Sequence, residues 1–235
     1  MQAKILYDNV ALPGFCSGWG FSCMVDNILF DTGEQAKALF VNMDKMNIDR
    51  SAIEAVVISH NHWDHIGGLW ELLKEQPGLT VYGCAGFSDD FKTKVAEYNG
   101  VFKETQPGQL IGKGIYVTGE MSCEYKGLPM PEQALIIPAD SGITVVTGCS
   151  HPGILNVLHR ALAVTDASRV LLAFGGFHLM SKSEQEIQAS IDQFKALPVY
   201  RVGPTHCTGD QAIALFRSRY GDNCIKLGSG SILEL

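Results

Sequence analysis

Histidine and aspartate are concentrated in one short stretch of the chain, residues 60–65, which read HNHWDH. In an extended loop, His60 and His62 point the same way, while Asp64 and His65 reach a second position about 3 to 4 Å further on. Imidazole and carboxylate groups are ligands that suit Zn²⁺, Mn²⁺ or Fe²⁺, and two-metal hydrolytic sites have this spacing. The stretch therefore predicts a site for one or two divalent metal ions.

Four histidines each follow an expected strand and precede an expected helix. They are His60 after residues 55–59, His151 after 143–147, His178 after 169–174 and His206 after 199–202. Ligands of α/β proteins bind outside the carboxyl ends of the strands. Because strand ends of a common sheet lie side by side, we expect these imidazoles to converge on one sheet edge.

Apolar periodicity alternates between strand and helix along most of the chain. Helices are expected at residues 34–47, 66–76, 152–164, 183–197 and 209–220, hairpins at 21–30 and 135–147, and final strands at 225–227 and 232–235. Ser183 is expected to cap its helix, with Glu186 at the capping-box position. Residues 81–131 have the weakest pattern, with a strand at 114–118 and a loop at 120–131. The mixture implies one layered α/β domain with helices covering the sheet faces.

The composition excludes several classes of protein. Of the 235 residues, 46% are hydrophobic and 18% are charged, which excludes intrinsic disorder. No apolar run approaches the roughly 18 to 20 residues that cross a bilayer, and residues 1–10 lack the apolar region of a secretory signal. A net charge of −7 argues against a nucleic-acid partner. We therefore expect a cytoplasmic protein with a small-molecule substrate and neither a nucleic-acid nor a membrane partner; a homo-oligomer stays open.

The cysteines favour a reducing compartment. There are seven of them, an odd number, and no C-x-x-C pair. This pattern is typical of free thiols rather than of a disulfide framework. Cys149 and Cys207 lie beside two of the candidate histidines and are interpreted as small buried thiols.

Two motifs in order along the chain resemble the metallo-β-lactamase superfamily. The HxHxDH pattern of residues 60–65 is preceded by FDTG at residues 30–33 and followed by the later single histidines. The resemblance covers essentially the whole chain, residues 1–235, as a single domain. It implies a four-layer αββα sandwich, in which two mixed sheets lie face to face with helices outside.

The resemblance also implies two ligand sets. It puts His60, His62 and His151 on a first metal ion. It puts Asp64, His65 and His206 on a second. Asp31 of the FDTG turn matches a carboxylate that steadies the metal-binding loop.

One departure from the family pattern lies after the third-histidine motif. The family has an aspartate there that bridges both metal ions, whereas residues 174–179 of this chain read FGGFHL, with no carboxylate. Together with GCSH at residues 148–151 and THCTG at 205–209, this resembles a narrower subgroup. Its members are described as metal-dependent hydrolases, or as dihydropterin ribofuranosyl-aminobenzene phosphate synthases of methanopterin biosynthesis. The chain would then hold either one metal ion, or two with His178 as a ligand.

The main expectation from these features is a metal-dependent hydrolase. A metal-bound hydroxide would attack a small-molecule ester or phosphoester related to pterins. Asp64 would orient the water and accept its proton, and His178 would stabilise the developing oxyanion. Zinc is the expected metal, with manganese and iron as alternatives.

Three other functions stay open at this stage. One is a phosphoribosyl-type synthase or transferase of methanopterin-like biosynthesis, with the metal ions binding a pyrophosphate. Another is redox chemistry at a di-iron centre, and the third is a non-catalytic protein that binds a metal or a metabolite. Trp19 and Tyr125 are candidates to stack on a flat substrate ring, and Lys126 is a candidate to pair with a phosphate.

Overall fold

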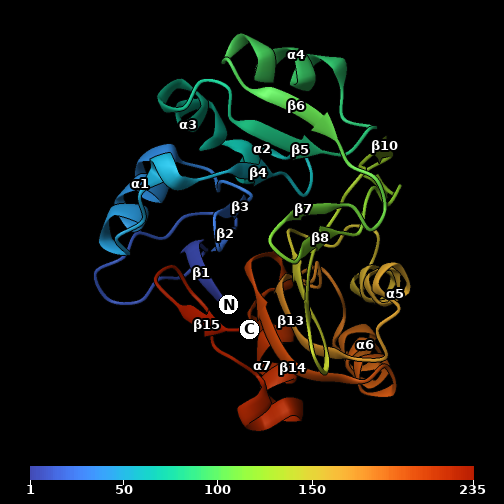
Figure 1. Ribbon diagram of the computed structural model, residues 1–235. Helices are drawn as coiled ribbons and strands as arrows, with labels where there is room; N and C mark the ends of the chain where they lie inside the picture. Colours follow the sequence, from blue (N-terminus) through green and yellow to red (C-terminus); the bar gives the residue numbers. More distant parts are fainter. The chain divides into compact units, whose positions relative to one another are not determined.

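The computed structural model describes all residues, 1–235, and the chain divides into two compact units (Figure 1). The first unit comprises Met1–Thr105 and Gly228–Glu234. The second comprises Gln106–Leu227 and the terminal Leu235. Each unit is built around its own mixed sheet, as expected of a chain with two sets of helices and strands. The assignment of residues 1–235 to a single domain stays a prediction.

The sheet of the first unit has seven strands in the order β15-β1-β2-β3-β4-β5-β6. Their bounds are β1 Gln2–Tyr7, β2 Ser22–Val25, β3 Ile28–Phe30, β4 Ala55–Val57, β5 Thr80–Gly83, β6 Val101–Glu104 and β15 Ile232–Glu234. The pairs from β15 to β3 are antiparallel, and those from β3 to β6 are parallel. The carboxyl ends of β3, β4 and β5 therefore lie at the same edge, and the HNHWDH stretch follows β4 there.

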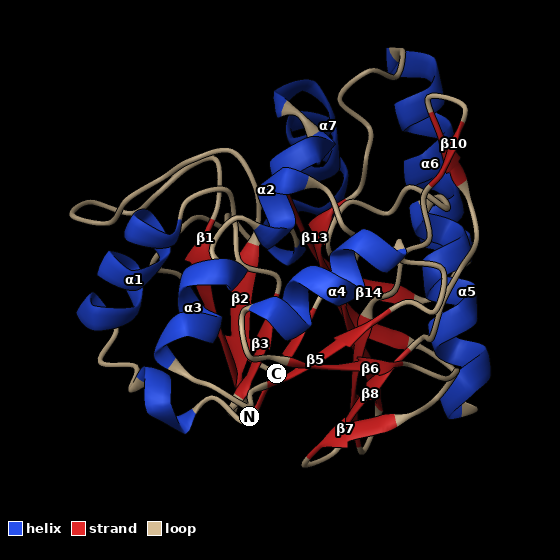
Figure 2. Cartoon of the chain, turned by 90° about the horizontal axis from the view of Figure 1, so that it is seen from above, coloured by secondary structure: helices blue, strands red, loops and turns tan.

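Helices of the first unit bury an apolar stripe against this sheet. They are α1 Ala36–Lys45, α2 Trp63–Ile66, α3 Leu69–Glu75 and α4 Asp89–Glu97, with a short 3₁₀ helix, η1, at Arg50–Ala52. In α1, Leu39 and Met43 are four residues apart, so they share one helix face, and both are fully buried in the core. Figure 2 shows α1 and α3 beside the strands β1 to β3. Ser88 begins α4 by accepting a hydrogen bond from the Phe91 amide, which satisfies one of the free N–H groups of the first turn.

The sheet of the second unit has six strands in the order β14-β13-β12-β11-β8-β7. Their bounds are β7 Leu110–Gly112, β8 Ile115–Val117, β11 Leu135–Ala139, β12 Gly142–Thr147, β13 Val170–Gly176 and β14 Val199–Thr205. A separate hairpin comprises β9 Glu124–Tyr125 and β10 Leu128–Pro129. Strands β12, β13 and β14 are parallel neighbours. The loops after all three therefore begin at the same edge of the sheet.

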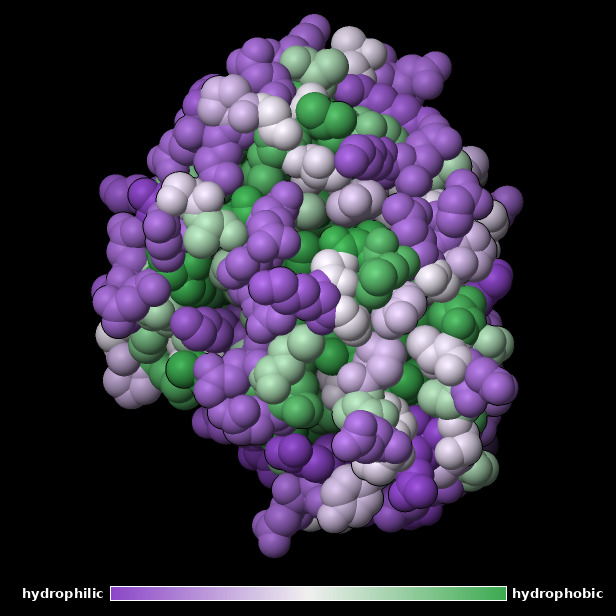
Figure 3. Space-filling view, in the orientation of Figure 1, coloured by the Kyte–Doolittle hydropathy of each residue, from purple (hydrophilic) through white to green (hydrophobic).

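Three long helices cover this second sheet. They are α5 Ile154–Thr165, α6 Glu184–Ala196 and α7 Asp210–Tyr220, with short 3₁₀ helices η2 His206–Thr208 and η3 Gly221–Asn223. Phe177, Phe194 and Phe216 form a fully or almost fully buried aromatic cluster, with ring centroids 5.2 to 5.5 Å apart. Ser183 caps α6 and forms the predicted capping box with Glu186. Figure 3 shows one face of the molecule, on which hydrophilic residues are interspersed with groups of hydrophobic ones.

Most predicted elements are confirmed, three predictions are wrong, and one helix was not predicted. Strand β4 lies in the seven-stranded sheet, whereas β12, β13 and β14 lie in the six-stranded one, so the four histidines do not follow strands of a common sheet. Residues 225–227 form no strand, and residues 120–131 contain the hairpin β9–β10 instead of only a loop. Helix α4 was not predicted, because only Phe91 and Val95 of its nine residues are buried, which leaves little apolar periodicity to recognise.

No helix of the chain is long and apolar enough to pass through a bilayer. The longest, α6, has 13 residues. About 20 apolar residues would be needed.

Candidate metal centre

The HNHWDH stretch turns directly from the end of β4 into the short helix α2. His60 is fully buried, His62 precedes the first residue of α2, and Asp64 and His65 lie within that helix. A Cβ atom at Gly67 would overlap the carbonyl oxygen of Glu34, so the chain needs glycine to leave α2 at this point. Both the amide and the hydroxyl of Thr32 donate to the carbonyl oxygen of His65, at 2.7 and 2.8 Å. The FDTG turn thus holds the end of the HNHWDH stretch.

Asp31 is the central acceptor of a buried hydrogen-bond network in the first unit. Its carboxylate accepts from the Ser59 amide, the Ser59 hydroxyl and Nδ1 of His65, each at 2.7 Å. Burial raises the pKa of Asp31, while the hydrogen bonds from His65 and Ser59 oppose that rise. Because the Ser59 hydroxyl donates to Asp31, it is left to accept from Nδ1 of His60, 2.8 Å away. Asp31 therefore orients two histidines, one of them through Ser59.

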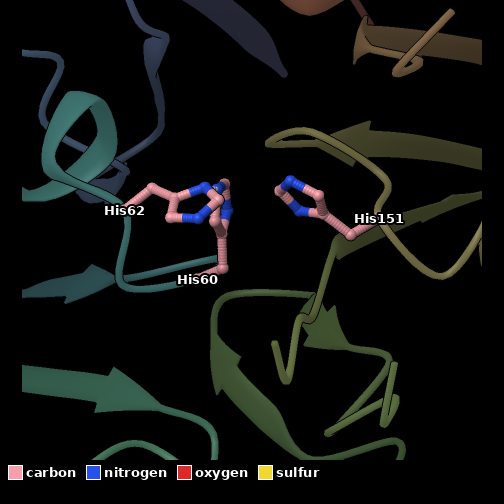
Figure 4. Close-up of side chains that lie close together, drawn as sticks. All are labelled: His60, His62 and His151. Atoms are coloured by element: carbon pink, nitrogen blue, oxygen red, sulfur yellow. Dashed lines mark hydrogen bonds between the residues drawn. The ribbon is translucent and has the colours of Figure 1, made fainter. Parts of the chain in front are cut away.

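These hydrogen bonds decide which nitrogen atoms are available to a metal ion. With Nδ1 acting as donor, His60 and His65 each present the lone pair of Nε2. Nε2 of His60 lies 3.1 Å from Nδ1 of His62, and the two rings meet edge to face, with their planes at 79° (Figure 4). Two imidazole nitrogens on a tetrahedral zinc ion, each about 2.0–2.1 Å from it, lie about 3.3 Å apart. The donor pair therefore fits a divalent metal ion.

Asp64 and His65 form a second donor pair in the same unit. Oδ2 of Asp64 lies 3.6 Å from Nε2 of His65, and both side chains are buried. The ring centroids of His60 and His65 are 4.2 Å apart, so the four predicted ligands of this stretch are close together. A carboxylate and an imidazole at this distance suit zinc, manganese or iron.

In the second unit, Glu132 is the central acceptor of a corresponding hydrogen-bond network. This buried carboxylate accepts from the amides of Cys149, Ser150 and His151 and from Nδ1 of His151, at 2.7 to 2.9 Å. Burial alone would raise the pKa of Glu132, but the hydrogen bonds of His151 and of the two backbone amides lower it below its ordinary value. His151, drawn after β12 in Figure 4, therefore presents its Nε2 atom.

Sequence reasoning missed both Ser59 and Glu132. Ser59 adjoins His60, but a lone serine at a strand end has no distinctive signal. Glu132 does have one, because an acidic residue three positions before the largely buried strand β11 must find a partner. What the sequence lacks is any sign that the partner is the loop at residues 149–151.

His178 follows β13 and lies among aromatic rings. Its ring centroid is 4.5 Å from that of His151 and 5.4 Å from that of Tyr125. Its Nδ1 atom is buried without a hydrogen-bond partner, which is an unusual state for a polar atom. The adjacent Cys207 thiol raises the pKa of His178.

The thiols of Cys149 and Cys207 lie next to the predicted ligand His206. Sγ of Cys149 is 3.4 Å from Nε2 of His206, and all three side chains are buried. Burial alone would raise the pKa of Cys207, but the Cys149 thiol and the imidazoles of His206 and His178 lower it well below its ordinary value. Both cysteines are the small buried thiols that were predicted, and the structure adds that they lie beside His206.

Backbone strain is concentrated at the same loops. Asp31, Ser150, His178 and His206 all have φ between 51° and 66°, the left-handed region that residues other than glycine avoid. Such strain persists only where surrounding contacts over-determine the conformation, and it clusters at functional sites.

The candidate substrate residues differ in their surroundings. Tyr125 lies on β9, with its ring centroid 4.8 Å from that of His151. The neighbouring Lys126 places its Nζ 5.1 Å from the centre of the Tyr125 ring. Trp19 lies in the first unit, 40% exposed, on the loop between β1 and β2. The structure thus brings Tyr125 next to candidate ligands of its own unit, with Lys126 beside the Tyr125 ring.

Comparison with known proteins agrees with this fold and these motifs. The family model of the metallo-beta-lactamase superfamily matches residues 25–206, so the chain belongs to this superfamily. A solved metal-dependent hydrolase of the beta-lactamase superfamily, Tm1679, is 30% identical, with a TM-score of 0.84 over 100% of this chain and 99% of that one. The metallo-beta-lactamase fold protein YhfI of Bacillus subtilis shares the fold at 14% identity, with a TM-score of 0.70 over 99% and 98% of the two chains. The predicted α/β metallo-β-lactamase fold is confirmed.

Two relatives from Methanocaldococcus jannaschii match along most of their length. One is 7,8-dihydropterin-6-methyl-4-(beta-D-ribofuranosyl)-aminobenzene-5'-phosphate synthase, 27% identical over 88% of this chain and 84% of its own. The other, the uncharacterised protein MJ0448, is 30% identical over 89% and 91%. The predicted subgroup resemblance is thereby confirmed.

The similarity to a synthase corrects the expected reaction. The main expectation was hydrolysis of a small ester or phosphoester, and it rested on superfamily membership. A curated relative with a named reaction product, matched over most of both chains, is a synthase, so the expectation of ester or phosphoester hydrolysis is wrong. Fold alone does not fix the reaction in a superfamily of this kind.

Proposed function

We propose that the protein is a synthase that joins a dihydropterin to an arylamine carrying a ribose phosphate. The observation that carries the proposal is the similarity, over 88% of this chain, to the synthase of M. jannaschii. The product named for that relative contains a 7,8-dihydropterin, a 6-methyl carbon, an aminobenzene and a ribofuranosyl phosphate. Its formation requires a carbon–nitrogen bond between the 6-methyl carbon and the amine.

The proposed reaction is a substitution at that carbon. The arylamine nitrogen attacks the carbon attached to the pterin ring, and pyrophosphate leaves from the same carbon. One carbon–oxygen bond breaks, one carbon–nitrogen bond forms, and the amine loses one proton. No oxidant or reductant is needed.

Residues of both units have roles in the proposal. We propose His60 and His62, with Asp64 and His65, as metal ligands in the first unit, and zinc as the metal. The assignment of His151 to the same ion stays a prediction of the resemblance. When bound, a divalent cation would supply charge stabilisation for the departing pyrophosphate. Asp31 and Ser59 fix the ring positions of His60 and His65, as their hydrogen bonds indicate.

The second unit would contribute recognition of the substrates. The Tyr125 ring is a flat face for the pterin or for the aminobenzene, since aromatic rings stack or meet edge to face. Lys126, next in the chain, is a cation for a phosphate group. His178 of the second unit would donate a hydrogen bond to a phosphate oxygen, whereas Asp64 of the first unit would accept the amine proton.

The test is product analysis with and without the amine acceptor. The protein is incubated with Zn²⁺ and the pyrophosphate ester of 6-hydroxymethyl-7,8-dihydropterin, either alone or with 4-(β-D-ribofuranosyl)aminobenzene 5′-phosphate, and the products are identified by mass spectrometry. We expect the conjugate when both substrates are present. Equal formation of free 6-hydroxymethyl-dihydropterin in both incubations, with no conjugate, would overturn the proposal.

Matched histidine variants connect the activity to the metal ligands. His62→Ala is expected to lose bound metal and conjugate formation together. His159→Ala changes an exposed histidine on α5 and is expected to keep both. A His62→Ala protein with full metal content would contradict the ligand assignment.

A further inference from the structure

Trp63 is the one exposed residue of the HNHWDH stretch. It is 58% exposed, whereas the other five residues of the stretch are buried or half-buried. Exposure by itself is ordinary for a single apolar residue. Trp63, however, lies directly between two predicted metal ligands, His62 and Asp64, on the first turn of α2. This position makes the indole ring a candidate to contact a molecule bound at the metal centre.

The surroundings of Trp70, on α3, show what a structural tryptophan looks like in this unit. The Trp70 ring packs against Phe91 and Tyr98, with ring centroids 5.7 and 5.4 Å apart, and Nζ of Lys94 lies 4.1 Å from its centre. Trp63 has neither a ring contact nor a cation contact of this kind. Its ring is therefore available to a ligand, whereas that of Trp70 is not.

The loop between β1 and β2 places a second exposed tryptophan close to Trp63. Gly20 of this loop packs on α2, because a Cβ atom there would overlap the carbonyl oxygen of Asp64. The Gly20 amide also donates to Oδ1 of Asn9, at 3.2 Å, which anchors the loop. Trp19, 40% exposed, precedes Gly20 in the chain, just as Trp63 precedes Asp64. The backbone contact thus brings two exposed indoles to one part of the first unit.

We propose that Trp63 stacks on the dihydropterin ring of the substrate. This inference rests on the proposed synthase function and names a residue that recognises one of its two substrates. In that substrate, a single methylene carbon joins the pterin ring to the pyrophosphate. A residue that contacts the ring must therefore lie close to the groups assigned to the pyrophosphate. Trp63 meets this requirement, because it adjoins His62 and Asp64 in the chain.

The chemistry of the two rings suits stacking. A dihydropterin is a flat, fused heterocycle with a π face, like a nucleic-acid base, and such bases stack on aromatic side chains. Tryptophan offers the largest ring surface for this contact. Tyr125, in the second unit, is then available to the aminobenzene of the other substrate.

The experiment measures binding of one substrate without turnover. Full-length protein loaded with Zn²⁺ is titrated calorimetrically with the pyrophosphate ester of 6-hydroxymethyl-7,8-dihydropterin, and the arylamine is omitted. We expect Trp63→Ala and Trp63→Leu to bind this ester about 5- to 150-fold more weakly, the value of stacking a base on an aromatic side chain. Trp63→Phe keeps a ring and should retain most of the affinity. Trp70→Phe, in the aromatic cluster of α3 and α4, is the control and should leave the affinity unchanged.

Two further measurements separate stacking from a structural role of Trp63. We expect Trp63→Ala to keep its full zinc content, by elemental analysis, and its full affinity for the arylamine. Loss of zinc in Trp63→Ala would overturn the inference, because the ring would then act by holding α2 in place. Equal affinity of Trp63→Ala and the unaltered protein for the pterin ester, or equal weakening in Trp63→Phe and Trp63→Leu, would also overturn it and would leave the synthase function standing. Failure of the unaltered protein to bind the pterin ester would instead overturn the proposed function, and the inference with it.

Discussion

At the scale of single residues, the candidate metal centre depends on two carboxylates, Asp31 and Glu132, that are not themselves predicted to bind a metal ion. Asp31 fixes His65 directly and His60 through Ser59, and Glu132 fixes His151 together with its loop. In each case, a hydrogen bond at Nδ1 selects the tautomer whose Nε2 lone pair is free to bind a metal ion.

Replacement of Asp31 tests this orienting role. Asp31→Asn keeps the size of the side chain but removes the charge and one acceptor oxygen, so His65 loses its preferred tautomer. We expect metal affinity to fall about 10- to 100-fold, as for other residues that orient metal ligands. Competition with a chromophoric chelator measures the change. An affinity equal to that of the unaltered protein would show that Asp31 does not orient the ligands.

Replacement of Glu132 should instead affect stability. Glu132→Ala leaves three backbone amides and His151 without their buried acceptor, and loss of one partner from a buried network costs about 3–5 kcal/mol. Urea unfolding of the metal-free protein measures this loss. Glu97→Ala, at an exposed position of α4, is the control and should change the free energy of unfolding by less than about 0.5 kcal/mol. A small effect of Glu132→Ala would mean that water replaces the carboxylate.

The residues that sequence reasoning found and missed differ in the kind of signal they carry. His60, His62, Asp64 and His65 are conspicuous because four potential metal ligands within six residues suit neither an apolar core nor an ordinary solvated surface. Ser59 and Glu132 act through hydrogen bonds that depend on tertiary structure, so the local sequence does not reveal them. Cys149 and Cys207 were predicted to be small buried thiols, and the structure confirms this, but local sequence could not show how close Cys149 lies to His206.

At the scale of elements, the start of α6 makes a prediction about pH. The capping box holds the pKa of Glu186 at about 2, below its ordinary value of 4.5, through hydrogen bonds from the backbone and hydroxyl of Ser183 and from Lys182. A lowered pKa in the folded state stabilises the protein at pH values above the ordinary pKa, and this stabilisation is lost as the pH falls through the folded pKa.

The contribution of Glu186 should therefore disappear in acid. We expect Glu186→Gln to be less stable than the unaltered protein at neutral pH, and the difference to shrink as the pH falls from about 4.5 to about 2. Urea unfolding across this range measures the difference. A difference that stays constant with pH would mean that the ionised carboxylate makes no contribution.

The hairpin β9–β10 is the element that sequence reasoning described least well. Two-residue strands carry too little periodicity to be recognised, so residues 120–131 were predicted as a loop. The hairpin nevertheless fixes Tyr125 against His151 and His178.

Tyr125→Ala tests whether the hairpin recognises an aromatic substrate. If the ring stacks on the pterin or aminobenzene, its loss should weaken substrate binding about three- to tenfold, the value of an aromatic pair beyond its buried area. Tyr125→Phe keeps the ring and should bind nearly as well as the unaltered protein. Isothermal titration with the arylamine substrate measures both variants, and equal weakening in the two would point to the hydroxyl group instead.

At the scale of the whole molecule, the fold class and the order of elements could be predicted, but the distribution of strands between two sheets could not be derived from periodicity. Strand β4 pairs with β3 and β5, whereas β12, β13 and β14 pair with one another. Pairing between distant segments is a property of the folded chain, and local patterns predict strands but not their partners. The family resemblance supplied the two-sheet architecture that the residues alone did not.

The reaction is likewise a property of the whole site rather than of its motifs. The same ligand pattern suits hydrolysis and group transfer, because a divalent ion stabilises anionic oxygen atoms in both. The two reactions differ in the group that receives the pterin carbon, which is water in one case and an amine in the other.

The most direct test of the synthase assignment is the ratio of conjugate formed to pyrophosphate released in one incubation with both substrates. The account predicts one conjugate for each pyrophosphate, and almost no pyrophosphate release when the arylamine is omitted. Pyrophosphate release that continues at the same rate without the arylamine, with no conjugate formed, would contradict it.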